Sequence, residues 1–91
     1  MATSVSEIDV FALEVKTTDD ELLVGLSDGR RISVPLVWFP RLLHATPEQR
    51  THFELIGDGE GIHWPDVDED ISVRGLLLGL SSVEYRRARS A

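Results

Sequence analysis

Residues 22–34 read LLVGLSDGRRISV, and this stretch fixes the register of a β-hairpin. Apolar side chains alternate on both sides of a turn signal, at Leu22, Val24 and Leu26 before it and at Ile32 and Val34 after it. A two-residue Asp-Gly turn would send these two sets to opposite faces, whereas a three-residue loop over 27–29 sets Val24 opposite Ile32. Because register follows the buried face, we predict the three-residue loop, with Gly29 in the left-handed conformation of a bulge.

The segments next to this hairpin are also patterned. Before it, Phe11, Leu13 and Val15 alternate with other residues, which predicts a strand that buries these three side chains on one face. After it, Pro35 ends the third strand, because proline has no N–H to donate to a β-ladder.

Two short helices are predicted next. Pro40 suits the first turn of a helix that carries Leu42 and Leu43 inward. A second helix starts with Thr46 as its N-cap, and Gln49 three residues later completes a capping box.

The last part of the chain is predicted to hold two strands and a helix. The strands are residues 53–56 and 62–64, joined by the glycine-rich reversal 57–61. The helix has Ser72 as its N-cap and turns its apolar residues inward, namely Val73, Leu76, Leu77 and Leu80. This order predicts an α+β fold, in which a small antiparallel sheet of hairpins packs against two or three short helices.

Size and composition suit one small domain. The chain has 91 residues, 42% of them hydrophobic, and no cysteine. We expect a flexible N-terminal segment over 1–10, a single domain over 11–80 and a basic tail over 81–91. The first residues lack the basic flank and apolar core of a signal peptide, and the apolar run 76–78 is far too short to cross a bilayer. Together with the absence of cysteine, these features predict a cytoplasmic protein.

Charge points to a protein partner. The formal net charge is −7, so the body of the domain should repel nucleic acids and anionic membranes and attract a basic protein. Arg86, Arg87 and Arg89 break this trend in the tail EYRRARSA. The tail is interpreted either as a solvated, frayed end or as an arm that contacts nucleic acid or an acidic partner.

An acidic cluster follows the Trp-Pro step in GIHWPDVDEDISVRGLLLG, residues 61–79. Asp66, Asp68 and Asp70 have the alternate spacing that opens an EF-hand loop. The sixth position of such a loop needs glycine and holds Ile71, and the twelfth needs glutamate and holds Leu77. The sequence therefore argues against a calcium loop here.

A second interpretation of the cluster is a small metal-dependent hydrolase that uses His63 with Asp66, Asp68 or Asp70. A transition-metal site would need imidazoles near these carboxylates, and only His63 is close to them in sequence. His63 alternates with Trp64 on the predicted strand, which favours a solvent-facing histidine. We therefore predict no metal ligands, no catalytic residues and no cofactor.

A third interpretation divides the acidic cluster in two. Asp70 and Ser72 would serve the start of the last helix, where negative charge and a side-chain cap are favourable. Asp66, Asp68 and Glu69 would form a solvated loop or an acidic edge that docks a basic partner. Asp66 and Asp68 are expected to be exposed.

Aromatic and basic side chains complete the candidate partner-binding set. Trp38 and Trp64 are interpreted as core residues or as binding anchors, since aromatics concentrate at interfaces. Trp64 is expected to be buried against the last helix, near Leu76 or Leu77. Arg41 is expected to pair with the acidic loop. Together with Asp66, Asp68 and Glu69, the residues Trp38, Arg41 and Trp64 are the predicted partner-binding residues.

The order of these features resembles the bacterial family called domain of unknown function 2442. The resemblance spans roughly residues 11–80, through LLVGLSDGRRISVPL and LLHATPEQRTHFELIGDGEGIHWPDVDEDISVRGLLLG. It rests on a set of positions in order: Asp28-Gly29, Phe53, Trp64-Pro65 and Asp70. The resemblance implies a small α+β fold with an antiparallel sheet packed on helices, and no assigned activity. It also implies small neighbouring genes that look like toxin–antitoxin modules, and fusion to helix-turn-helix domains in some members.

Three functions remain open from the sequence. The leading one is a non-enzymatic protein-interaction or regulatory module, which the family resemblance associates with toxin–antitoxin genes. A homo-oligomer is a further possibility for this module. The others are the metal-dependent hydrolase and a nucleic-acid contact through Arg86, Arg87 and Arg89.

Overall fold

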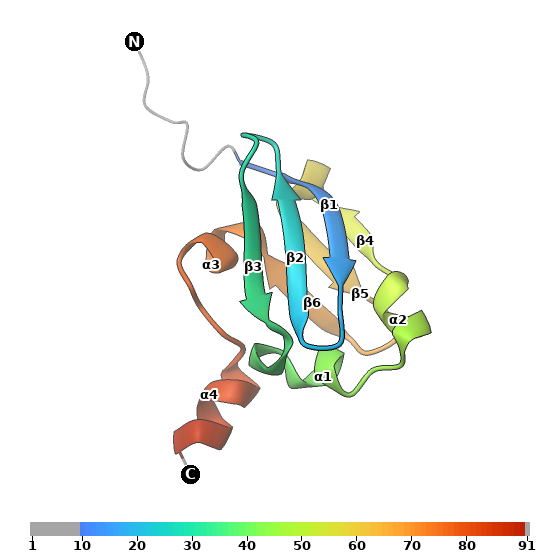
Figure 1. Cartoon of the computed structure of the whole chain (residues 1–91), viewed down its shortest axis with the longest axis vertical. Helices are drawn as coiled ribbons and strands as arrows, with labels where there is room; N and C mark the ends of the chain where they lie inside the picture. The colour runs from blue at the N-terminus through green and yellow to red at the C-terminus, as the bar shows by residue number, and fades with distance from the viewer. Residues whose placement is uncertain (1–9, 91) are drawn as a thin grey trace.

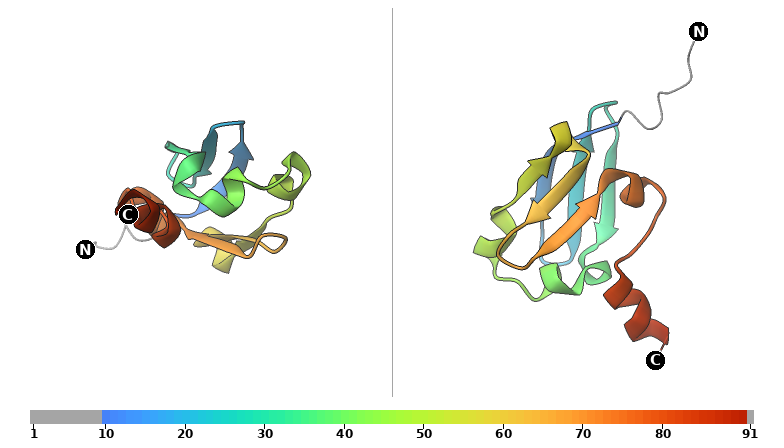
Figure 2. Two further views of the ribbon diagram at one scale, coloured as in Figure 1. Left: turned by 90° about the horizontal axis from the view of Figure 1, so that it is seen from below. Right: turned by 180° about the vertical axis from the view of Figure 1, so that it is seen from behind.

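The computed structural model describes residues 10–90, with the Ser90 side chain left out. Six strands form two antiparallel three-stranded sheets, ordered β1-β2-β3 and β4-β5-β6. The first sheet contains β1 (Ala12–Thr17), β2 (Glu21–Leu26) and β3 (Arg31–Pro35). The second contains β4 (Glu54–Ile56), β5 (Gly61–Trp64) and β6 (Glu69–Ser72). The sheets face each other as two layers (Figures 1 and 2), so the predicted α+β class is confirmed, with its sheet divided in two.

The hairpin that joins β2 and β3 has the predicted register. Val24 pairs with Ile32 and Leu22 with Val34. The Leu26 N–H donates to the Arg30 carbonyl at 2.8 Å, which closes a loop of residues 27–29. Gly29 has φ +95°, the left-handed conformation that the face-matching argument requires.

The prediction for β1 is partly wrong. The strand exists, but its pairing with β2 shifts between Ala12 and Glu14. This irregularity changes which side chains face the core. Ala12 is buried, whereas Leu13 is 67% exposed, so Phe11, Leu13 and Val15 do not share a buried face.

The chain between the two sheets forms three short helical turns. These are η2 (Leu36–Trp38), α1 (Pro40–Leu43) and α2 (Pro47–Thr51). Pro40 occupies the first turn of α1, and Leu42 is buried. Thr46 and Gln49 form the predicted capping box, in which the Gln49 N–H donates to Thr46 Oγ1 and the Thr46 N–H donates to Gln49 Oε1.

Strand β6 was not predicted from the sequence. Residues 69–72 pair with β5, where a loop leading into the last helix was expected. Helix α3 (Val73–Leu77) then begins with the predicted N-cap, because Ser72 Oγ accepts a hydrogen bond from the Gly75 N–H at 2.9 Å. The helix ends before Leu80, which is exposed instead of packed inward.

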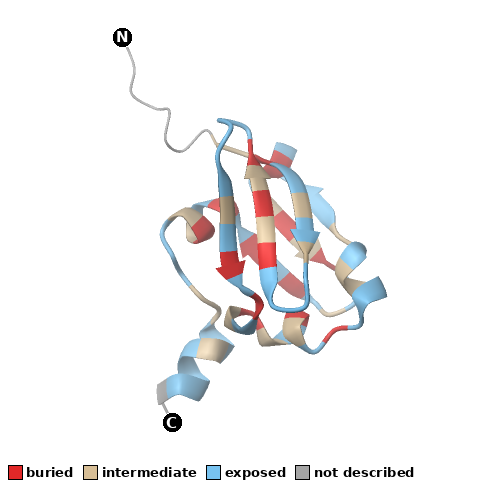
Figure 3. Cartoon of the chain, viewed as in Figure 1, coloured by how far each residue is buried: buried red, intermediate tan, exposed pale blue. Residues whose placement is uncertain are grey.

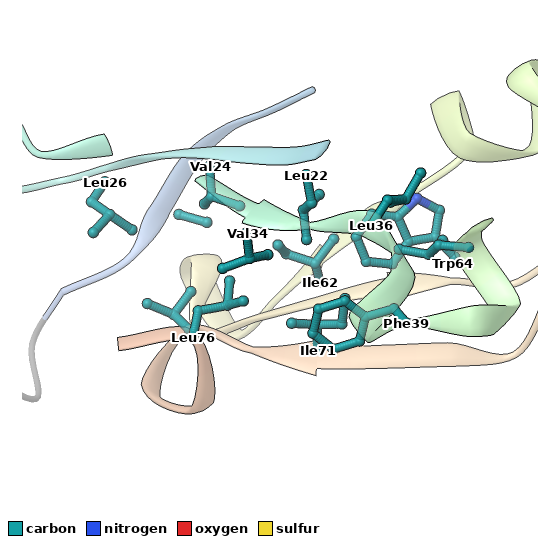
Figure 4. Packing of buried hydrophobic residues seen from close by; sticks show 13 residues of the cluster. Leu22, Val24, Leu26, Val34, Leu36, Phe39, Ile62, Trp64, Ile71 and Leu76 are labelled. Atoms are coloured by element: carbon teal, nitrogen blue, oxygen red, sulfur yellow. The ribbon is translucent and has the colours of Figure 1, made fainter. Parts of the chain in front are cut away.

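The core fills the space between the sheets and is closed at one end by η2 and α1 (Figure 4). Burial alternates along β2, β5 and β6, as expected for sheets with one face on the core (Figure 3). The core residues with full burial include Leu22, Val24, Leu36, Leu42, Ile62, Trp64 and Val73. The predicted burial of Trp64 is confirmed. Its predicted neighbour Leu76 lies at the opposite end of the cluster (Figure 4).

Residues 83–90 form helix α4 (Val83–Ser90), so the expected fraying of this end is wrong. Arg86, Arg87 and Arg89 are exposed on it, as expected of a solvated end. The Ser82 N–H, just before the helix, donates to the Trp38 carbonyl at 3.1 Å. The predicted flexible segment 1–10 lies outside the described residues except for Val10. Within residues 10–90, no helix has the length and apolar character that crossing a membrane requires.

Candidate functional site

A groove of about 520 Å³ runs beside β6. Strand β6 lies on one side of it, and α3, the connection 78–82 and the start of α4 complete its walls. Its volume falls in the range of about 300–1,000 Å³ that is usual for ligand sites. Figure 2 shows the C-terminal segment passing beside β6 on its way to α4. The groove therefore combines a sheet edge with a segment from the end of the chain.

The open edge of β6 faces this groove. Within the described chain, β6 pairs only with β5. The Val73 N–H donates to the Glu60 carbonyl, and hydrogen-bonded pairs alternate along an antiparallel ladder. Glu69 and Ile71 therefore bond toward β5, while the backbone N–H and C=O of Asp70 and the N–H of Ser72 point toward the groove. The Ser72 C=O belongs to helix α3, because the carbonyl of an N-cap residue accepts the first bond of the helix.

Glu69 is the buried charged residue of the site. It pairs with Trp64 on the core side of the sheet and is 8% exposed. Among the described residues, its carboxylate makes no hydrogen bond and no ion pair within 4.0 Å, and it lines the groove. Burial raises the pKa of the Glu69 carboxyl, and the positive charge of Arg41 opposes this change. Desolvation without a paired cation explains that direction.

Arg41 joins the acidic loop to α4. Its Nη1 donates to the Asp68 carbonyl at 2.6 Å and lies 3.8 Å from Asp68 Oδ2, and its Nε donates to Glu84 Oε2 at 3.1 Å. The hydrogen bond to Glu84 raises the pKa of Arg41. The predicted pairing of Arg41 with the acidic loop is confirmed. Since two partners hold this guanidinium, it is not free to move onto Glu69.

The other acids of the cluster lie apart from one another and have different partners. Asp66 and Asp68 are exposed, as predicted. Asp66 Oδ2 lies 3.1 Å from His52 Nδ1. Asp70 Oδ1 contacts His63 Nδ1 across the strands instead of serving the helix start, because the two residues form a non-hydrogen-bonded pair, whose side chains lie close. The expected role of Asp70 at the helix start is therefore wrong.

The residues of the hydrolase interpretation are thus not gathered into one site. His63 meets Asp70, whereas Asp66 meets His52. In the described part of the chain, no three His, Asp or Glu side chains are placed to hold one metal ion.

The two tryptophans differ in accessibility. Trp64 is fully buried, and its indole N–H donates to the Arg50 carbonyl at 3.0 Å. Trp38 is half-buried against the core. We therefore leave Trp64 out of the candidate binding surface.

The groove could not be predicted from the sequence without strand β6, which forms one of its walls. A signal was present, since Ile71 and Val73 alternate with Asp70 and Ser72. Extending that alternation back by two residues places Glu69 on the apolar face, where the structure has it.

Comparison with known proteins gives a family and a fold. Residues 12–82 match the family described as Protein of unknown function (DUF2442). No curated protein matches the chain. A crystal structure of a protein of unknown function from Rhodospirillum rubrum is similar, with a TM-score of 0.70 and 26% identity over 84% of this chain and 94% of that chain. An uncharacterised protein from Chromobacterium violaceum, solved by NMR, shares the fold, with a TM-score of 0.69 and 23% identity over 87% of this chain and 75% of that chain.

Proposed function

The chain belongs to the family described as Protein of unknown function (DUF2442), and we propose that it is a non-enzymatic interaction module that binds a basic partner protein. The observation that carries this proposal is the groove beside β6, where an open strand edge lies next to a buried carboxylate. Open strand edges and concave surfaces are features that proteins use to bind other proteins.

The charge of the chain supports a basic partner. The formal net charge is −7, and the exposed carboxylates of Asp66 and Asp68 lie on the loop that leads into β6. Opposite charge speeds encounter and selects partners more than it adds affinity. These two carboxylates would attract the partner, and Glu69 in the groove would meet it.

A regulatory, antitoxin-like role in the cytoplasm is the finer form of this proposal. It rests on the family resemblance, which implies neighbouring genes of the toxin–antitoxin kind. A small basic protein encoded beside this chain is the partner that such an arrangement would supply.

Co-expression tests the proposal. The tagged chain is produced together with the proteins encoded beside it, and the purified complex is analysed at increasing salt. We expect a basic partner to co-purify and to dissociate more readily at high salt. The double variant Asp66→Asn/Asp68→Asn should slow association, whereas the matched pair Glu14→Gln/Glu21→Gln on the first sheet should leave it unchanged.

Three other outcomes would contradict the proposal. A saturable rise in melting temperature at micromolar calcium, magnesium or zinc, lost in Asp66→Asn, would favour the hydrolase instead, because binding to the native state stabilises it. Salt-dependent binding of duplex DNA, lost when Arg86, Arg87 and Arg89 are changed to glutamine, would favour the nucleic-acid alternative. A partner-free dimer in solution would favour self-association.

A further inference from the structure

The Glu69 carboxylate poses a specific physical problem. The residue as a whole is 8% exposed, yet no side-chain oxygen in the described residues is both fully buried and unpartnered, so the Glu69 oxygens open to the groove. Buried carboxylates are rare unless they are paired. The charge of Arg41 acts on the Glu69 carboxyl, but the Arg41 guanidinium is held by Glu84 and by the Asp68 carbonyl. A cation that enters the groove from outside could pair with the Glu69 oxygens there.

The backbone around Glu69 offers a second feature. The outward N–H and C=O groups of Asp70 and the outward N–H of Ser72 present two donors and one acceptor along the groove. An extended chain can pair with such an edge, and its alternate side chains then enter the pockets beside it. Glu69 points to the core side of the sheet, so every second side chain of an added strand would face the same side.

We propose that the groove binds an extended segment of the partner protein as an added strand on β6, with one arginine or lysine side chain of that segment against Glu69. This inference rests on the proposed function and names its binding site.

The walls of the groove restrict the segment further. Leu76, Leu80 and Val83 supply apolar surface, and Leu80 and Val83 are about half exposed, at 48% and 52%. Arg86 and Arg87 line the groove from α4. Glu84 of the same helix also lines the groove, so this wall carries both signs of charge.

A peptide series tests this mode of binding. The probe is a short blocked peptide of alternating threonine and valine with one central arginine, followed by fluorescence polarisation. The first matched peptide carries citrulline, which is the neutral isostere of arginine. The second carries N-methyl groups on alternate residues along the edge that would pair, which removes its backbone donors.

Variants of the chain test the same two contacts from the other side. Glu69→Gln keeps the shape of the side chain and removes its charge. Asp70→Pro removes an N–H that faces the groove without breaking the ladder to β5, which proline tolerates on an edge strand. Asp70→Ala controls for the loss of the carboxylate, and Glu54→Gln on the other edge of the same sheet controls for charge. Circular dichroism checks that each variant is folded.

We expect the arginine peptide to lose about tenfold or more in affinity with Glu69→Gln, as for other buried charge pairs. Citrulline should cause a similar loss. The N-methylated peptide and Asp70→Pro should also bind weakly, while Glu54→Gln and Asp70→Ala should bind as the wild type. On binding, the amides of Asp70 and Ser72 should gain protection from hydrogen exchange.

The inference can fail while the proposed function stands. If the arginine peptide does not bind at millimolar concentration, or binds Glu69→Gln and the wild type equally, the added-strand mode is wrong. The co-expression experiment then decides separately whether a basic partner binds elsewhere. Equal binding of the N-methylated peptide would overturn the backbone pairing, and protection of the β4 edge instead of β6 would overturn the location.

Discussion

Replacing Trp64 by phenylalanine and by alanine separates two contributions of this side chain to stability. The indole ring is fully buried, with its centroid 6.1 Å from that of Phe53, and its N–H donates to the Arg50 carbonyl at 3.0 Å. Alanine removes the ring and the hydrogen bond together. Phenylalanine keeps most of the apolar contact and removes the donor.

The expected losses in the free energy of unfolding follow from these contacts. Truncation of a buried tryptophan to alanine costs about 3–5 kcal/mol. Leaving a buried carbonyl without its donor costs about 1–3 kcal/mol. Because the Trp64–Arg50 hydrogen bond is only part-buried, the expected cost of Trp64→Phe lies at the low end of this range. At roughly 0.05–0.15 kcal/mol per residue, a chain of 91 residues is stable by about 5–14 kcal/mol. The alanine variant should therefore be marginally folded, and the phenylalanine variant should remain folded.

Urea unfolding followed by circular dichroism measures both values. The slope of free energy against urea should not change, because the variants expose nearly the same surface on unfolding. Trp38→Phe is the matched control, since the Trp38 indole is half-buried and makes no hydrogen bond within the described residues. If Trp64→Phe costs no more than Trp38→Phe, the hydrogen bond to Arg50 does not contribute, and the reasoning is refuted.

Four further changes test other parts of the structure. Gly29→Val should cost more than about 1 kcal/mol through left-handed strain alone, because no atom lies within 4 Å of the added Cβ; Gly29→Asn should cost less in the same urea titration. Gly59→Ala should cost more than Gly29→Val, because its Cβ would lie 2.5 Å from the Ala12 carbonyl oxygen; equal costs would argue against that close approach. Arg50→Met should lower stability by about 1.5–3 kcal/mol, since Arg50 donates to two carbonyls at the end of α1; a neutral effect would show that these bonds are replaced by water. Burial raises the pKa of the Glu69 carboxyl in the folded state, so the stability that its protonation provides is lost as pH rises from about 4.3 through the folded pKa. The Glu69→Gln variant should therefore melt at a higher temperature than the wild type near neutral pH and lose this advantage below about pH 4.3. A difference in melting temperature that does not depend on pH would refute burial of the charge as the cause.

The parts of the fold that the sequence predicted are those governed by local rules. The loop at Gly29 follows from which face is buried, and the Thr46–Gln49 capping box follows from residues three positions apart. Such signals depend on neighbours in sequence, so no knowledge of the tertiary structure is needed to find them.

The parts that were missed depend on contacts between distant residues. Glutamate and aspartate are uncommon in strands, so Glu69 and Asp70 looked like a loop until pairing with β5 made them part of a sheet. The shift at Ala12 in β1 depends on its pairing with β2. The burial of Glu69, on which the candidate site depends, follows from its place opposite Trp64 on β6, and this strand was not predicted.

The order of the strands has a consequence for how the chain reaches its native state. In each sheet, every strand pairs only with its neighbour in sequence. Closing short loops costs little chain entropy, and proteins rich in local contacts fold faster than those that must join distant segments. We expect each meander to begin forming on its own, and the docking of the two apolar faces to be the step that completes folding. The domain should therefore refold faster than a Greek-key sandwich of similar length, in which strands must find partners far along the chain.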